Sequence, residues 1–153
     1  MSAPDGQSRV LDTVAMEGVV AAVRRFHKAT DTPVRIVPRI PSTARRDLRI
    51  NLINSETNKE LIPALVAGDM VEIADGIADA IYVAVGTALE YGIPLSVIWS
   101  LVCATNDAKI DPTTGMVVRR ADGKILKPPG WSPPDIERAL LEHGWDPTAT
   151  PTT

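Results

Sequence analysis

Apolar residues recur every three or four positions through the first half of the chain, the spacing that places side chains on one face of a helix. The first run predicts a helix over residues 9–29, which Thr30 and Pro33 end. Three prolines, Pro33, Pro38 and Pro41, then predict an extended crossing loop, because proline cannot donate the backbone hydrogen bond that a helix needs.

Capping residues place two further helices. Ser42 is the predicted N-cap of the first, and Pro63 is expected to kink or divide that helix because its ring removes a backbone hydrogen bond. Asp69 is the predicted N-cap of the next helix, which the pattern extends from about residue 70 to residue 91 before Gly92 stops it.

The C-terminal third of the chain has a different pattern of residues, with β-prone runs and several prolines after one short helix. A short apolar helix is predicted from about residue 97 to residue 108, and the Asp122-Gly123 pair between two β-prone runs predicts a hairpin. Prolines surround Trp131, and residues 135–143 are predicted to form a last short helix. The sequence therefore predicts an all-α fold, a bundle-like subunit of four to five helices with a short C-terminal β-hairpin.

We expect these elements to form one domain over residues 9–145, in which residues 111–134 are the hairpin and a proline-rich arm. Residues 1–8 are predicted to be a disordered tail and residues 146–153 a flexible one. A hydrophobic fraction of 44% beside 23% charged residues is enough for one core, and it excludes a wholly disordered chain.

Charge and cysteine content narrow the class of protein. The net charge of −3 argues against duplex nucleic acid as a partner, because phosphate binding needs a basic excess. The single cysteine, Cys103, excludes an intrachain disulfide, and residues 1–8 do not resemble a signal peptide, so a cytoplasmic protein is expected. The longest apolar stretch contains Asp75 and Asp79, so we expect no membrane partner.

Five carboxylates fall on two of the predicted helices. Spacings of three, four and seven residues place side chains on the same face, so each helix carries an acidic stripe. The stripes are Glu56 with Glu60, and Glu72 with Asp75 and Asp79. Asp75 and Asp79 interrupt apolar residues and are expected at the edge of the core, where an acid needs a partner. Mg²⁺ is the partner we expect, because it prefers oxygen ligands and completes its shell with substrate phosphates.

The alternative is that these acids face solvent or pair with basic residues of the same region. Those basic residues are Arg45, Arg46, Arg49 and Lys59.

An amide and several basic side chains follow the acids. Asn106, Asp107 and Lys109 end the short apolar helix, and the predicted hairpin is basic. Its basic residues are Arg119, Arg120, Lys124 and Lys127. Such a group fits a polyphosphate, although a basic hairpin also serves simply to discourage pairing with another strand.

The pattern extends beyond the acids to a set of motifs along the chain. They are Arg24-Arg25-Phe26-His27, residues 52–61, Asp-x-x-x-Asp-x-x-Tyr-Val at 75–83, Gly86-Thr87-Ala88, Asn106 to Lys109, and Gly-Lys-x-x-Lys-Pro at 123–128 before Trp131. Together they resemble the all-α nucleoside triphosphate pyrophosphohydrolases, the MazG-like superfamily that includes phosphoribosyl-ATP pyrophosphohydrolase and the dimeric dUTPases. The resemblance covers most of residues 20–140.

The resemblance implies cleavage between the α and β phosphates of a (deoxy)nucleoside triphosphate or related nucleotide, giving a monophosphate and pyrophosphate. It implies a Mg²⁺ site, which Mn²⁺ would also fill, made by Glu56, Glu60, Asp75 and Asp79 with help from Glu72. Glu56, Glu60 and Asp79 are the implied catalytic residues. The implied substrate-binding residues are Asn106, Lys109, Arg119, Lys124, Lys127 and His27.

The first acidic motif departs from the family pattern. Relatives carry a denser set of glutamates there, whereas this chain has Ser55 and Lys59 beside Glu56 and Glu60. Fewer acids weaken the attraction for Mg²⁺. The alternative function is therefore a catalytically impaired nucleotide-binding or assembly module with the same fold.

Four other residues have more than one interpretation. His27 is expected to be a surface residue or a helix cap, with a place in the nucleotide pocket as the alternative. Trp99 is expected in the core, and Cys103 as a small buried hydrophobe without a nucleophilic role. Trp131 is expected to fasten the C-terminal segment to a neighbouring subunit, with stacking on a base as the alternative.

Apolar residues lie on several faces of two of the predicted helices, more than so short a chain covers by itself. We therefore expect a homodimer or a dimer of dimers with closed symmetry.

Overall fold

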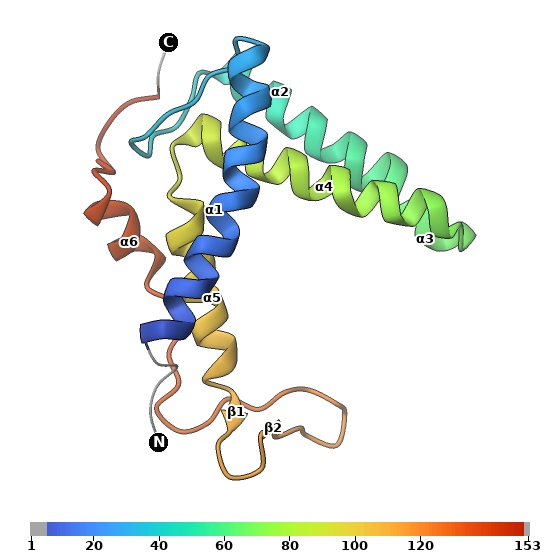
Figure 1. Ribbon diagram of the computed structural model, residues 1–153, viewed down its shortest axis with the longest axis vertical. Coiled ribbons are helices and arrows are strands. Elements are labelled where there is room, and N and C mark those ends of the chain that lie inside the picture. Colours follow the sequence, from blue (N-terminus) through green and yellow to red (C-terminus); the bar gives the residue numbers. More distant parts are fainter. Residues whose placement is uncertain (1–5, 152–153) are drawn as a thin grey trace. The chain divides into compact units, whose positions relative to one another are not determined.

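The computed structural model describes residues 6–151, which are mostly helical, as Figure 1 shows. These residues form two compact units. The first, here called the α4 unit, comprises residues 19–94 and 140–151, and the second, the α5 unit, comprises residues 6–18 and 95–139. The prediction of one domain over residues 9–145 stays a prediction.

Helix α1 spans Gly6–Ala29 and so begins three residues before the predicted start. The proline-rich crossing loop that follows binds the end of a later helix. The amide of Arg35 donates to the carbonyl of Leu89 over 2.9 Å, and the amide of Arg39 donates to that of Tyr91 over 3.0 Å. Gly92, with a φ of 70°, lies against this loop, and a β-carbon on it would be 2.2 Å from the carbonyl oxygen of Val37.

The next helical stretch is continuous but changes its winding. Helix α2 spans Thr43–Asn54, the π-helix η1 spans Ser55–Leu61, and helix α3 spans Ile62–Ala67. Ser42 is the N-cap residue, as predicted, although its side chain makes no capping hydrogen bond. Pro63 lies in the first turn of α3, just after the π-helical winding ends, and the helical stretch continues through it.

Helix α4 spans Met70–Tyr91, as predicted from its caps. The Asp69 carboxylate accepts hydrogen bonds from the amides of Val71 and Glu72, at 3.0 and 3.3 Å, and so holds the first turn. In Figure 1, α4 runs back alongside the rod formed by α2, η1 and α3.

A buried ion pair joins α2 to the end of α4. Glu90 is fully buried, and its carboxylate accepts from Nε and a terminal nitrogen of Arg45, at 2.8 and 2.6 Å. Arg49 donates to the same carboxylate over 3.3 Å and to the carbonyl of Val83 over 2.6 Å. Burial lowers the pKa of Arg49, while the negative charge of Glu90 acts in the opposite direction.

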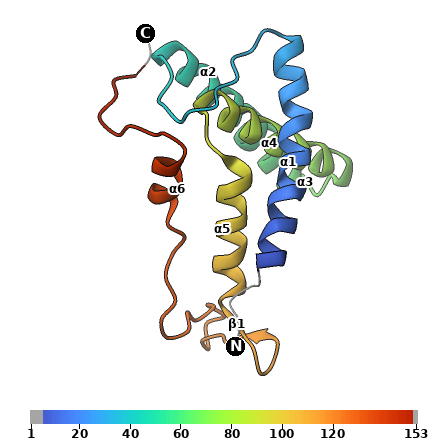
Figure 2. The same cartoon turned by 60° about the vertical axis from the view of Figure 1, so that its left-hand side comes forward.

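Helix α5 spans Leu95–Asp107 and leads directly into strand β1, Ile110–Asp111 (Figure 2). Strand β1 pairs antiparallel with β2, Met116–Val117, so that Ile110 faces Val117. A second turn lies at Asp122-Gly123, where the hairpin was predicted. An isolated antiparallel bridge between Arg119 and Ile125 closes it, and the amides of Arg120 and Leu126 donate across it to the carbonyls of Lys124 and Val118, each over 2.8 Å. The final helix, α6, spans Ile136–Glu142.

The fold class is therefore the predicted one, mostly helical with a short antiparallel hairpin. Trp99 was expected in the core, but 43% of it is exposed in the single chain. Across the residues that the structure describes, no helix is long and apolar enough to span a membrane.

Candidate functional site

The two acidic stripes lie on η1 and α4, which pack against each other. Glu56 and Glu60 belong to the π-helix η1. In this winding each backbone hydrogen bond joins residues five apart, as the bond from the Ile62 amide to the Thr57 carbonyl shows. In such a helix, residues five apart lie one above the other, and Ser55 Oγ accordingly lies 3.5 Å from Glu60 Oε1. Short π-helical segments occur frequently at functional sites.

Gly76 allows η1 to approach α4 closely. A β-carbon on Gly76 would lie 3.1 Å from Cα and 3.2 Å from Cβ of Leu61, the last residue of η1. Gly76 is buried, and in the sequence it stands between the acids Asp75 and Asp79. The glycine therefore brings the backbone that carries Glu56 up to the backbone that carries Asp75 and Asp79.

Four of the five acids interact electrostatically. The pKa of Glu56 is raised first by its partial burial and then by the negative charges of Glu60, Asp79 and Asp75. Glu72, in the first turn of α4, is not among the charges that act on Glu56. The structure thus places Glu56 of one stripe within the electrostatic influence of Asp75 and Asp79 of the other, but not of Glu72.

The surroundings of these acids differ from the expectation. Asp75 and Asp79 were expected at the edge of the core, but both are exposed in the single chain, because α4 turns Gly76 rather than its acids toward η1. Pairing with nearby basic residues does not occur either. In the part of the chain that the structure describes, Arg45 and Arg49 pair with Glu90, and none of the five acids forms an ion pair.

The donor chemistry of this cluster fits a hard divalent cation, since carboxylate oxygens are the ligands that Mg²⁺ prefers. A cation also relieves the mutual repulsion that raises the pKa of Glu56. In the positions seen here, however, no three acid, histidine or cysteine side chains among residues 6–151 converge closely enough to hold a metal. A cation held by three of these acids would require their side chains to turn toward one another.

A small cavity of about 250 Å³ lies in the same unit, between the ends of α1, α2 and α4. Its lining includes Phe26 and Tyr82, whose rings meet edge to face with centroids 6.0 Å apart. His27 also lines it but is only 4% exposed, so the expected surface position is wrong. Its Nδ1 lies 3.3 Å from the carbonyl oxygen of Pro33 and donates to it, because a carbonyl can only accept.

Gly86 explains why His27 is buried. A β-carbon on Gly86 would lie 2.9 Å from His27 Nε2 and 2.8 Å from a terminal nitrogen of Arg49. The histidine therefore occupies space that only a glycine leaves free. Sequence reasoning missed the roles of Gly76 and Gly86, for which a glycine amid strong helix formers was the available signal.

The family model of phosphoribosyl-ATP pyrophosphohydrolase matches residues 23–106, more than half of the 153 residues. The chain belongs to the phosphoribosyl-ATP pyrophosphohydrolase family. The matched segment contains α2, η1, α3 and α4, and with them all five acids. The curated proteins contain no match to this sequence. Membership gives this family member a pyrophosphohydrolase-type, nucleotide-processing function, in a family whose members typically depend on a divalent metal.

The remaining predicted site residues of this phosphoribosyl-ATP pyrophosphohydrolase family member belong to the α5 unit. Asn106 ends the matched segment, and its side-chain oxygen accepts from the Lys109 ammonium over 2.8 Å. Arg119 donates to the carbonyl of Gly123 over 2.8 Å, while Lys124 is exposed. The assignment of these residues and of Lys127 to substrate binding stays a prediction.

Trp131 and Cys103 are both held within the α5 unit. The Trp131 indole donates to the carbonyl of Thr105 in α5 over 2.9 Å, so the tryptophan fastens the C-terminal segment to its own chain. Cys103 is half-buried, and burial, followed by the charges of Asp12 and Asp107, raises the pKa of its thiol. A raised pKa is the opposite of what a nucleophilic cysteine needs.

Proposed function

We propose that this protein is a Mg²⁺-dependent nucleotide pyrophosphohydrolase that cleaves the bond between the α and β phosphates of a (deoxy)nucleoside triphosphate or related nucleotide. One observation carries the proposal: the half-buried Glu56 of η1 lies within the field of Glu60, Asp75 and Asp79. Like charges gathered without a basic partner favour a bound cation over a purely structural role.

The acids of this cluster have different roles in the proposed reaction. Bound Mg²⁺ supplies charge neutralisation and polarisation of water and phosphate. Glu60, Asp75 and Asp79 hold the cation, with Glu72 at the start of α4 as a helper. Glu56 takes the proton from the water that attacks phosphorus, because its raised pKa makes its carboxylate a stronger base than an ordinary glutamate.

The basic residues of the α5 unit supply the positive charge that the substrate phosphates need. Asn106 and Lys109 contact the phosphates, and Arg119, Lys124 and Lys127 neutralise the charge that develops on the pyrophosphate leaving group. His27 lines the cavity beside Phe26 and binds the substrate there.

The second candidate function is a nucleotide-binding module with impaired catalysis. Lys59 carries a positive charge within η1, between Glu56 and Glu60, and Ser55 lies against Glu60 where relatives have more acids. Under this alternative the protein binds nucleotide without turnover, and Ser55→Glu with Lys59→Glu restores hydrolysis.

Pyrophosphate release from a panel of ribo- and deoxyribonucleoside triphosphates, and orthophosphate release from the corresponding diphosphates, tests the proposal. We expect release from one or a few substrates with Mg²⁺ or Mn²⁺ and none with a chelator. Folded protein that releases no pyrophosphate from any substrate, yet binds nucleotide by calorimetry, would establish the binding module instead.

We also propose that the protein works as a homodimer or a dimer of dimers. Met70, Ile77 and Ile81, spaced by seven and four residues, share one face of α4 and are exposed in the single chain. Exposed apolar faces of this kind mark interaction surfaces. We expect light scattering after size exclusion to give at least twice the 16.4 kDa chain mass, and Ile77→Glu with Ile81→Glu to reduce it to one chain.

A further inference from the structure

One tryptophan ties the proline-rich arm to the end of α5. Residues 126–134 of the arm form no helix or strand, and four of them are prolines, which donate no backbone hydrogen bond. Trp131 lies among these prolines, and its half-buried indole donates to the carbonyl of Thr105 over 2.9 Å. The ring is therefore held beside the C-terminal end of α5.

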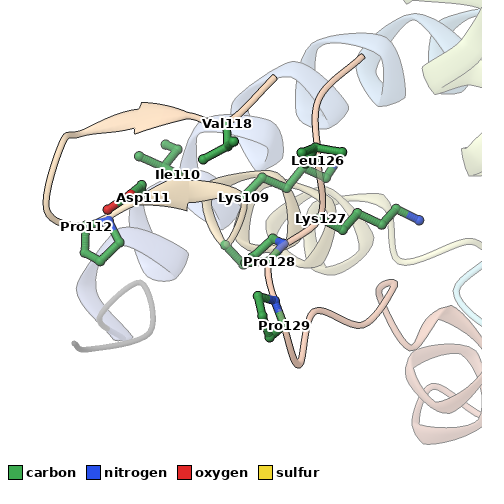
Figure 3. Close-up of a pocket in the computed structure, with 10 residues that line it drawn as sticks. Lys109, Ile110, Asp111, Pro112, Val118, Leu126, Lys127, Pro128 and Pro129 are labelled. Atoms are coloured by element: carbon green, nitrogen blue, oxygen red, sulfur yellow. The ribbon is translucent and has the colours of Figure 1, made fainter. Parts of the chain in front are cut away.

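Two lysines from different segments meet this ring. The ammonium of Lys127 lies 4.0 Å from the centre of the Trp131 ring, and that of Lys109 lies 5.4 Å from it. Cation–π attraction acts within ~6 Å of a ring centre, so both ammonium groups are within its range. Figure 3 shows Lys109 beside the start of the hairpin and Lys127 on the arm, in the lining of one groove.

Neither ammonium group is neutralised by its contacts. In the part of the chain that the structure describes, Lys109 and Lys127 form no ion pair. The further partner of Lys109 is the side-chain oxygen of Asn106, at 2.8 Å, which carries no charge. The electron-rich face of an aromatic ring attracts a cation without cancelling its charge. Both charges thus remain available to an anion.

A lysine that is already restrained binds an anion more tightly than a free one. A long side chain loses conformational entropy when a ligand immobilises it. Lys127 is exposed, and its contact with the Trp131 ring restrains it before any ligand arrives. Restraint of this kind increases affinity, because less entropy remains to be lost on binding.

We propose that Trp131 is a positioning residue, whose ring holds Lys109 and Lys127 in the arrangement that receives the substrate phosphates. This role rests on the proposed function, which places the two lysines at the phosphates. It is exerted by the face of the ring, through the lysines, and not by stacking of the ring on a base. The family model ends at residue 106 and so includes none of these three residues.

Variants of the full chain separate the ring face from the indole hydrogen bond. Trp131→Phe keeps an aromatic face but lacks the N–H that donates to Thr105, and Trp131→Leu lacks both. Trp99→Leu is the matched control, because Trp99 is an exposed tryptophan of α5 with no cation over its ring among the described residues. Binding of inorganic triphosphate, which has no base to stack, is measured by calorimetry in chelator.

We expect Trp131→Leu to weaken triphosphate binding about tenfold, Trp131→Phe to stay within about threefold of the parent, and Trp99→Leu to change nothing. Equal losses in Trp131→Phe and Trp131→Leu would assign the effect to the hydrogen bond that fastens the arm. That result overturns the proposal, as does unchanged binding in Trp131→Leu or a parent protein that does not bind triphosphate.

Two further measurements distinguish positioning from a purely structural role. If Trp131 acts through Lys127, then Trp131→Leu should cost less than about threefold once Lys127→Gln has removed the charge, whereas independent effects would multiply. In the parent protein, the Trp131 ring should shift the NMR signals of the Lys127 side-chain methylene protons upfield. Multiplying losses, or unshifted methylene signals, would contradict the proposal without relying on the fold of one variant.

The hydrolysis assay keeps this role separate from the proposed function. A parent protein that binds triphosphate with the expected sensitivity to Trp131→Leu, yet hydrolyses no nucleotide, loses the proposed function and keeps the role of Trp131. A parent protein that hydrolyses nucleotide with the same kcat/KM in Trp131→Leu keeps the proposed function and loses the role of Trp131.

Discussion

Gly76 of α4 lies so close to Leu61 of η1 that a β-carbon on the glycine would be 3.1 Å from the leucine Cα. The contact is tighter than ordinary van der Waals packing and involves backbone on the leucine side, so it cannot be relieved by a side-chain rotation alone. The distance between the two acidic stripes, and with it the candidate metal site, depends on this absence of a side chain.

Substitution of Gly76 should therefore separate the stripes. We expect Gly76→Val to abolish most of the pyrophosphate release and to raise the Mg²⁺ concentration needed for half-maximal rate, with a smaller effect for Gly76→Ala. Gly18→Ala, in α1 with no atom within 4 Å of the added carbon, is the control and should stabilise the protein by ~0.5 to 1 kcal/mol. Unchanged metal dependence in Gly76→Val would contradict this role for the glycine.

Asp79 should be required for turnover and dispensable for folding. Its carboxylate is exposed and unpaired in the described chain, so its removal costs little stability. We expect Asp79→Ala to lose at least a hundredfold in kcat while its circular dichroism and melting temperature stay close to those of the parent. The exposed α2 residue Asp47 provides the control, Asp47→Ala, which should keep full activity.

The raised pKa of Glu56 predicts the direction of the pH dependence. Burial and the neighbouring acids keep this carboxyl protonated to a higher pH than the ordinary value of 4.5, so activity should fall on acidification before an isolated glutamate would titrate. Saturating Mg²⁺ favours the charged form and should move the acid limb of kcat/KM to lower pH. An acid limb that does not respond to the Mg²⁺ concentration would assign it to another group.

Glu90 should contribute more to stability than any surface acid. It is fully buried beneath Arg45 and Arg49, and its loss leaves the Arg49 guanidinium buried without a counter-charge. We expect Glu90→Ala to lower the free energy of unfolding by ~3 to 5 kcal/mol in a denaturant titration. Glu137→Ala, at an exposed position in α6, should change it by less than ~0.5 kcal/mol and so provides the comparison.

The elements that the sequence predicted best are those whose ends are determined locally. Helix α4 begins at the Asp69 cap and ends at Gly92 in the left-handed conformation, and both signals act within one turn of the helix. The acidic stripes were found for the same reason, since spacing along one helix determines which residues share a face.

The errors concern features that depend on distant parts of the chain. His27 is buried because Gly86, far along the sequence, leaves room for its ring, and Trp99 is exposed although its neighbours are apolar. The π-helical winding of η1 has no signal in its own residues. It lies between a helix tied to Glu90 through Arg49 and a proline that starts the next helix, and it packs on Gly76.

The crossing loop gives α4 an ending made by another part of the chain. The last carbonyls of a helix have no hydrogen-bond donor within the helix. Here the amides of Arg35 and Arg39 donate to the carbonyls of Leu89 and Tyr91. The Arg35 guanidinium donates to the carbonyl of Glu90 over 2.6 Å. Helix α4 therefore needs the crossing loop in order to keep its C-terminal turn folded. A fragment that begins at α2 would carry every predicted metal ligand but not Arg35 and Arg39, so the helix that carries three of those ligands would fray from its C-terminal end.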